Sequence, residues 1–135
     1  MRRALMIEDN PVFRHLIRLV LETDGFAVHE ACDATGIVRL TRQVVPDVIL
    51  MDLGLPGPRD GLDACAAIRA LEEFQSTPIV VVSGFSEPID RQRAFAAGAK
   101  AYLTKPFDPI ELIGVIRRVV PRGRQRRLAA DEPHR

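Results

Sequence analysis

The chain has 135 residues, of which 47% are hydrophobic and 27% are charged, as expected for one ordinary globular domain. A domain of this size buries roughly two thirds of the surface that its unfolded chain exposes, so its core needs no disulfide or metal. The formal net charge is +1, which excludes a strong overall attraction to nucleic acid or to acidic substrates.

The cysteines and the N-terminal residues indicate the cellular compartment in which the protein is expected. Cys32 and Cys65 are far apart and form no C-x-x-C motif, which argues against a disulfide scaffold and against zinc. We therefore expect two reduced thiols in a cytoplasmic protein. No apolar run reaches the roughly 18 residues of a membrane span. The apolar stretch after Arg3 ends at Glu8, which is too short for a signal peptide. The sequence predicts no membrane attachment.

The first third of the chain predicts strand, helix, strand and helix. The apolar run 4–7 indicates a buried strand. Asn10 as N-cap and Pro11 at the first position predict a helix that Gly25 ends. Its apolar stripe comprises Val12, Leu16, Leu19 and Val20.

Residues 26–31 alternate between apolar and polar side chains, as an edge strand does. A second helix is predicted from an Asp33 cap through Ile37 and Leu40, and it ends before Pro46.

The remainder of the chain continues the alternation. Apolar runs predict central strands at 48–51 and 79–82, and a short strand is expected at 101–103. Helices are expected over 62–71, over 88–97 and from Asp108 to Val120. The alternation predicts an α/β fold, a flavodoxin-like doubly wound five-stranded parallel sheet of order 2-1-3-4-5 with five helices.

Residues 1–121 are expected to form the domain, and 122–135 to be a basic, disordered tail. An arginine cluster spans the last helix and this tail, at positions 117, 118, 122, 124, 126 and 127. It is interpreted first as a solvated tail and second as a linker to a partner or output domain. Nucleic-acid binding ranks last, because no recognition helix or interleaved aromatic residue accompanies the charges.

Polar residues follow four of the predicted strands, at the edge where open α/β sheets bind ligands. Glu8 and Asp9 follow the first strand, Asp52 the third and Ser83 the fourth, while Lys105 lies two residues past the fifth. Two carboxylates about 5 Å apart repel by roughly 3 kcal/mol at an effective dielectric of 20, so the cluster needs a cation. Lys105 supplies part of the charge, and Mg²⁺, which prefers oxygen ligands, would supply the rest.

This combination suggests phosphoryl transfer. Asp52 is the preferred nucleophile, since it ends the central strand and precedes a Gly-rich loop. The metal, Lys105 and Ser83 would stabilise charge on the transferred group. Asp9 would ligate the metal directly, and Glu8 through water.

Five motifs, in order, resemble the receiver domains of bacterial response regulators over roughly residues 4–120. They read MIEDN at 6–10, ILMDL at 49–53, the loop residues Pro56 and Asp60-Gly61, VVSG at 81–84, and YLTKP at 102–106. The resemblance implies that a histidine-kinase phosphohistidine phosphorylates Asp52. It also implies that Asp9, Asp52 and the Gly54 carbonyl hold Mg²⁺.

The resemblance further implies that Ser83 and Tyr102 form a switch pair, with Tyr102 turning inward behind the serine. Lys105 would contact the phosphoryl oxygens, and the Lys105-Pro106 bond would be cis. The sequence departs from the family in its loop 56–61, which looks one residue longer, and in the acidic pair Glu8-Asp9 in place of two aspartates.

We therefore expect a phospho-acceptor signalling domain without its own output domain, limited to self-directed phosphotransfer and autodephosphorylation. Its partners would be a histidine kinase or phosphotransfer protein, and an effector that binds a remodelled surface of the fourth helix, fifth strand and fifth helix. Arg91, Arg93 and Tyr102 are candidates for exposure there, although packing favours a half-buried Tyr102. Nucleic acid is disfavoured as a partner, and dimerisation on phosphorylation is left open.

Two alternatives remain. A Mg²⁺-dependent phosphatase would use Asp52 for turnover, but such enzymes usually carry an acid two residues later, where this chain has Gly54. A pseudo-receiver would only bind partners, but no acceptor-site position is missing here. Away from the site, His15 and His29 are expected in solvent, and Cys65 is expected to pack inside.

Overall fold

The computed structural model describes residues 1–55 and 60–121, so the predicted tail at 122–135 and positions 56–59 of the loop expected to be one residue longer lie outside the described residues. The sheet is parallel and has the predicted order β2-β1-β3-β4-β5. Its strands are β1 Arg2–Ile7, β2 Phe26–Ala31, β3 Val48–Met51, β4 Ile79–Ser83 and β5 Ala101–Thr104.

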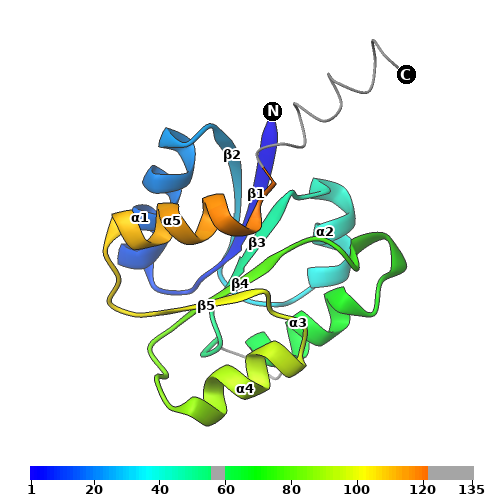
Figure 1. The fold of residues 1–135 in the computed structure, drawn as a ribbon. Coiled ribbons are helices and arrows are strands. Elements are labelled where there is room, and N and C mark those ends of the chain that lie inside the picture. Colours follow the sequence, from blue (N-terminus) through cyan, green and yellow to red (C-terminus); the bar gives the residue numbers. More distant parts are fainter. Residues whose placement is uncertain (56–59, 122–135) are drawn as a thin grey trace, which may run out of the picture.

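Helices cover both faces of this sheet (Figure 1). On one face lie α1 and α5, and on the other lie α2, α3 and α4. The helices are α1 Pro11–Thr23, α2 Ile37–Val44, α3 Gly61–Arg69, the 3₁₀ helix η1 Glu72–Phe74, α4 Pro88–Ala96 and α5 Pro109–Val119. None of these helices is both long and apolar enough to cross a bilayer.

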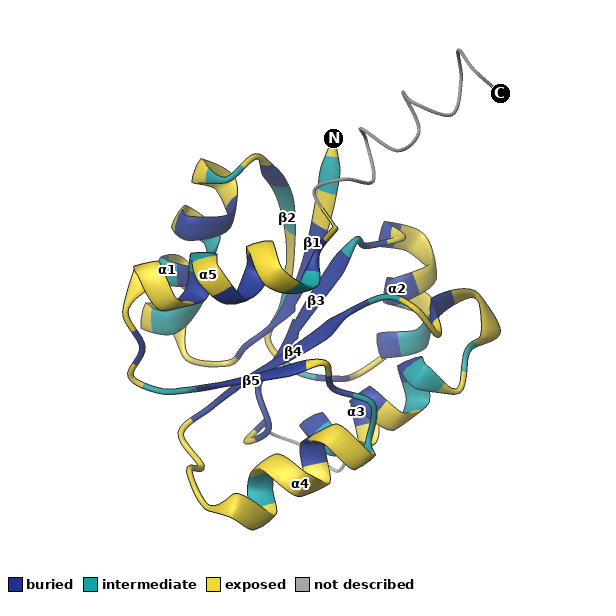
Figure 2. Ribbon diagram, viewed as in Figure 1, coloured by how far each residue is buried: buried dark blue, intermediate teal, exposed yellow. Residues whose placement is uncertain are grey.

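The central strands are buried on both faces, which explains their continuous apolar runs (Figure 2). Successive side chains of a strand point to opposite faces. Leu5 therefore joins the hydrophobic cluster beneath α2 and α3, whereas its neighbour Met6 joins the cluster beneath α1 and α5. The sheet thus divides the core into two layers and leaves its carboxyl edge for polar residues.

Helix α1 begins as predicted but buries a different face. The Asn10 side chain accepts hydrogen bonds from the amides of Val12 and Phe13, and Pro11 opens the helix. The predicted stripe is wrong in part, because Val12 and Leu19 are 72% and 48% exposed. The buried residues are Ile17, Val20 and Leu21. The apolar residues of α1 fit more than one helical face, and packing on the sheet and on α5 selects one of them.

Two predicted boundaries on the other face were wrong. Asp33 does not cap α2; it accepts a hydrogen bond from the Thr35 amide, and Gly36 is the N-cap with a φ of 68°. Helix α3 begins at Gly61, where the Asp60 side chain accepts from the Asp63 amide. It ends at Arg69, before the predicted end at residue 71, and the 3₁₀ helix η1 follows beyond that predicted end.

The guanidinium group of Arg69 explains how the chain is held after α3. It donates to four backbone carbonyls that belong to η1, to the segment before β4 and to the turn after α4, namely those of Phe74, Gln75, Thr77 and Gly98. These charge-assisted hydrogen bonds connect segments up to 29 residues apart. They stabilise the turn that ends the helix earlier than its sequence pattern predicts.

Helix α3 starts in direct contact with the backbone that carries Asp52. The Gly61 amide donates to the Leu53 carbonyl over 3.3 Å. A Cβ atom at position 61 would overlap the Asp52 carbonyl oxygen and would lie 2.7 Å from Leu53 Cα. Only glycine permits this approach of a helix start to the end of β3.

We expect Gly61→Ala to lower the free energy of unfolding by about 1–3 kcal/mol, the usual cost of forcing a group into a packed site. Gly114→Ala, on the exposed side of α5 with nothing within 4 Å, is the matched control. It should stabilise the protein by about 0.5–1 kcal/mol through helix propensity. Urea denaturation of both variants checks this, and equal effects would contradict the close approach.

The two thiols differ in environment as well. Cys65 packs in the core between α3 and the sheet, as predicted, whereas Cys32 is exposed, and both are free. Burial raises the pKa of the Cys65 thiol to about 12. Below that pH, Cys65 stays protonated and therefore unreactive as a nucleophile.

We expect a disulfide reagent such as 5,5′-dithiobis(2-nitrobenzoate) to modify one thiol per native chain at pH 8, and both thiols in denaturant. Cys32→Ser should abolish the native reaction, whereas Cys65→Ser should leave it unchanged. Absorbance of the released thiolate measures the stoichiometry. Rapid modification of Cys65 in the native protein would contradict its burial.

Candidate functional site

Backbone hydrogen bonds carry the sheet pattern past the strand ends and so place the predicted site residues. The Glu8 amide donates to the Ala31 carbonyl over 3.0 Å. The Asp52 amide donates to the Ile7 carbonyl over 3.0 Å, and the Lys105 amide to that of Ser83 over 2.8 Å. Each residue is therefore attached to the neighbouring strand, and the side chains converge on one edge.

Two strands run one residue further than predicted at this edge. Ser83 pairs with Thr104 across β4 and β5, so Ser83 is the last residue of its strand and Lys105 directly follows its own. The Lys105-Pro106 peptide bond is cis, as expected. The serine and the lysine are therefore held by the sheet itself rather than by a loop.

The three predicted acidic residues form a cluster. Glu8, Asp9 and Asp52 each offer a carboxylate oxygen, and these oxygens all lie within 4.8 Å of one another. Glu8 and Asp52 are buried, with 1% and 7% of their surface exposed, whereas Asp9 is exposed. The cluster therefore opens to solvent on the Asp9 side.

The Lys105 ammonium group lies between the two buried carboxylates. Its Nζ atom is 2.8 Å from Glu8 Oε1 and 3.0 Å from Oε2, where it donates a hydrogen bond. The same atom is 3.5 Å from Asp52 Oδ2 and 4.6 Å from the centre of the Phe13 ring. Lys105 thus pairs mainly with Glu8 and only secondarily with the acceptor candidate Asp52.

The negative charge of the three carboxylates is incompletely balanced, since the Lys105 ammonium group pairs with Glu8 and Asp52. Burial raises the pKa of Glu8, and Asp52 adds to the rise, while hydrogen bonds from Lys105 and the Asn10 amide oppose it. Glu8 Oε1 contacts Lys105 as an ion pair but accepts no hydrogen bond from the described residues. A buried oxygen without a hydrogen bond in an all-oxygen, electronegative cluster fits a hard divalent cation.

Asp52 is also contacted by the loop that follows it. The Gly54 amide donates to Asp52 Oδ1 over 3.2 Å, while Oδ2 faces Lys105. Both carboxylate oxygens therefore have a positive or partially positive neighbour. That the Gly54 carbonyl is a metal ligand stays a prediction.

Ser83 and Tyr102 are connected through Phe85, a residue that sequence reasoning missed. The Phe85 amide donates to Ser83 Oγ over 3.1 Å, and the Tyr102 hydroxyl donates to the Phe85 carbonyl over 2.7 Å. The two predicted switch residues therefore hold the turn between β4 and α4 through a single residue: Ser83 binds the amide of Phe85 and Tyr102 binds its carbonyl. An exposed phenylalanine after a Ser-Gly turn was the available signal.

Tyr102 is more buried than expected for an exposed or half-buried residue, with 8% of its surface accessible. Burial raises the pKa of its phenol, and the Ser83 side chain partly opposes this rise. Arg91 covers the ring at 4.8 Å and donates to Thr104 Oγ1 over 3.2 Å. Arg91 and Arg93 are exposed as predicted, as are His15 and His29.

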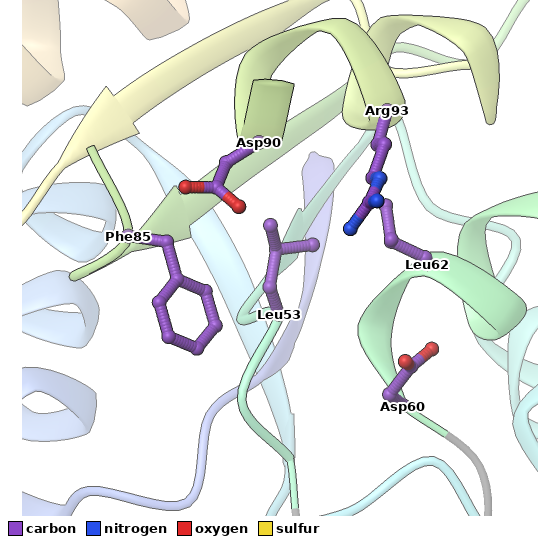
Figure 3. A pocket seen from close by; sticks show the side chains of 6 residues that line it. All are labelled: Leu53, Asp60, Leu62, Phe85, Asp90 and Arg93. Carbon is purple, nitrogen blue, oxygen red and sulfur yellow. The ribbon is translucent and has the colours of Figure 1, made fainter. Parts of the chain in front are cut away.

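A cleft of ≈ 270 Å³ adjoins the site between α3 and α4 (Figure 3). Its apolar part comes from Leu53, Leu62 and Phe85, and its charged part from Asp60, Asp90 and Arg93. Because Leu53 directly follows Asp52, and Phe85 bonds to Ser83, the cleft borders both the acceptor and the switch turn. The sequence pattern did not predict it.

The chain is similar to known proteins along most of its length. The family model "Response regulator receiver domain" matches residues 4–117. The DNA-binding dual master transcriptional regulator RpaA of Synechocystis is 34% identical over 122 residues, which cover 90% of this chain and 50% of that protein. The transcriptional regulatory protein CseB of Streptomyces coelicolor is 38% identical over 119 residues, which cover 88% of this chain and 49% of that protein. The chain thus spans about half the length of these relatives.

Solved structures with a similar fold agree with the family match. The chemotaxis protein CheY4 of Vibrio cholerae superposes with a TM-score of 0.82 at 28% identity, covering 88% of this chain and 98% of that one. The receiver domain of sensor histidine kinase PA1611 of Pseudomonas aeruginosa has a magnesium ion coordinated in its active-site cleft. It superposes with a TM-score of 0.80 at 34% identity, covering 88% of this chain and 97% of that one. Together with the fold and the convergent acidic edge, these matches show that the chain belongs to the response regulator receiver domain family, the signalling domains of two-component systems.

Proposed function

We propose that Asp52 accepts a phosphoryl group from the phosphohistidine of a histidine kinase or phosphotransfer protein. The observation that carries this proposal is the position of the Asp52 carboxylate, which is buried at the end of β3, 3.5 Å from the Lys105 ammonium group and inside the acidic cluster. Aspartate carboxylates are established nucleophiles that form aspartyl phosphates.

In the proposed reaction an oxygen of Asp52 forms a bond to phosphorus while the bond from phosphorus to the imidazole nitrogen breaks. Lys105 lies close enough to contact the transferred group, and the Gly54 amide orients the acceptor carboxylate. Mg²⁺ would be held by Asp9 and Asp52, with Glu8 next to it and the Gly54 carbonyl as a further ligand, and would supply positive charge to the phosphoryl oxygens. Return to the resting state is hydrolysis of the acyl phosphate at the same residue.

The signal would leave the site through Ser83. In the proposed switch its hydroxyl turns toward the phosphoryl group and gives up the hydrogen bond from the Phe85 amide. Phe85 is then held only through its carbonyl by Tyr102, so the turn before α4 rearranges. The new charge-assisted contacts supply the free energy for this change.

The rearranged surface of α4, β5 and α5 is the proposed contact for an effector protein, and Arg91 lies on it. Receiver domains as a family interact with histidine kinases and effectors. The expected absence of a nucleic-acid partner stays a prediction, because relatives such as RpaA and CseB are DNA-binding or transcriptional regulators. Cytoplasmic location, dimerisation on phosphorylation and the domain boundary at 121 likewise stay predictions.

We expect acetyl phosphate with Mg²⁺ to add one phosphoryl group to the wild-type chain, detected by intact mass. The adduct should be labile to hydroxylamine, as acyl phosphates are, and absent from Asp52→Asn. Asp63→Asn, which alters an exposed aspartate of α3, should retain it. A folded wild-type protein without an adduct would contradict the proposal and favour a pseudo-receiver, and sustained turnover of a phosphomonoester would favour a phosphatase.

We expect beryllium fluoride with Mg²⁺, a phosphoryl mimic, to shift the amide resonances of Phe85 and of α4 in the wild-type protein. Ser83→Ala should reduce these shifts and lower the free energy of unfolding by about 1 kcal/mol, because the Phe85 amide loses its acceptor. Ser86→Ala, an exposed serine in the same turn, is the matched control and should respond like wild type. ¹⁵N-edited NMR spectra provide the measurement, and a full response of Ser83→Ala would show that the signal leaves by another route.

A further inference from the structure

Arg14, in the first turns of α1, is attached to the backbone of the acidic pair. Its Nη1 atom donates to the Glu8 carbonyl over 3.0 Å and to the Asp9 carbonyl over 3.2 Å. These two consecutive carbonyls belong to the residues whose carboxylates converge on Asp52. The guanidinium group therefore contacts the turn that carries the acidic side chains without contacting the carboxylates themselves.

The other side of the guanidinium group is fixed to the sheet. Arg14 Nε lies 3.4 Å from Glu30 Oε1 on β2, and both side chains are only 27–28% exposed. Glu30 also pairs with Arg18, which in turn pairs with Glu22 at 2.8 Å and donates to the Val28 carbonyl. Arg14 thus connects the edge strand β2 to the acidic turn, whereas these contacts of Arg18 are with residues of α1 and β2.

We propose that Arg14 is a positioning residue that holds the Glu8-Asp9 turn so that its carboxylates can share a cation with Asp52. The turn needs such support, because Asp9 and Asn10 are exposed and the clustered carboxylates repel one another. Because Arg14 holds the carbonyls of Glu8 and Asp9, it also fixes the backbone positions from which their two carboxylate side chains extend. Residues that orient metal ligands in this way typically contribute 10–100-fold to metal affinity.

A role through charge alone would act in the opposite direction. The positive guanidinium group repels a nearby cation, so its removal would strengthen Mg²⁺ binding if charge were its main effect. Positioning predicts weaker binding instead. The sign of the change in Mg²⁺ affinity therefore separates the two roles, and this inference, which rests on the proposed phospho-acceptor site, is tested without phosphorylation.

The experiment titrates MgCl₂ into ¹⁵N-labelled protein and follows the amide resonances of the site. We expect Arg14→Met to weaken Mg²⁺ binding by about 10-fold. Arg18→Met, which removes an arginine from the same Glu30 but leaves the acidic turn untouched, should change the affinity by less than about twofold, as distant surface charges do. Arg14→Lys keeps the positive charge and one donor nitrogen, so its Mg²⁺ affinity should lie between those of the wild type and Arg14→Met.

Thermal unfolding without Mg²⁺ is measured alongside for every variant, and Arg18→Met is expected to lose at least as much stability as Arg14→Met. Unchanged or tighter Mg²⁺ binding by Arg14→Met, or equal weakening by Arg18→Met, would overturn the inference. Failure of the proposed function is recognised separately, as a wild-type protein that binds Mg²⁺ but forms no acyl phosphate at Asp52.

Discussion

The buried ion pair between Lys105 and Glu8 is the interaction on which the site depends. It places a cation 3.5 Å from Asp52 while the stronger contacts of that cation are with Glu8. Asp52 is thereby left close to positive charge but not fully neutralised, which suits the proposed role of its carboxylate as a phosphoryl acceptor. One ammonium group cannot balance three carboxylates, and three clustered carboxylates have the oxygen ligands that the proposed Mg²⁺ ion prefers.

The two sides of this edge are held by different kinds of contact, and the difference matches their proposed tasks. On the β1 side the Glu8-Asp9 turn is attached to a guanidinium group that is itself paired with Glu30 on β2. On the β4 side the turn at Phe85 is held by neutral hydrogen bonds to Ser83 and Tyr102, which exchange more easily. Charge-assisted contacts are the stronger of the two kinds, so the β4 side has the contacts that cost less to break in the proposed switch.

Sequence reasoning predicted the sheet order and the convergence of the polar residues at one edge, because parallel alternation leaves few topologies and brings all the carboxyl strand ends together. It failed where several local solutions were equally good. Asp33 had the chemistry of an N-cap, but Gly36 in a left-handed conformation starts α2. Val12 and Leu19 had the spacing of a buried stripe, but they lie on the solvent side of α1.

By itself the sequence determined the α/β architecture and the identity of the acidic, hydroxyl and ammonium groups at one edge, because both follow from periodicity along the chain and from the order of its elements. Only the tertiary structure decided which groups contact each other: the pairing of Lys105 with Glu8 before Asp52, the burial of Tyr102, and the attachment of Arg14 and Phe85 to the site. These contacts join residues from different elements, and side-chain packing, which no local pattern encodes, selects among the partners within reach.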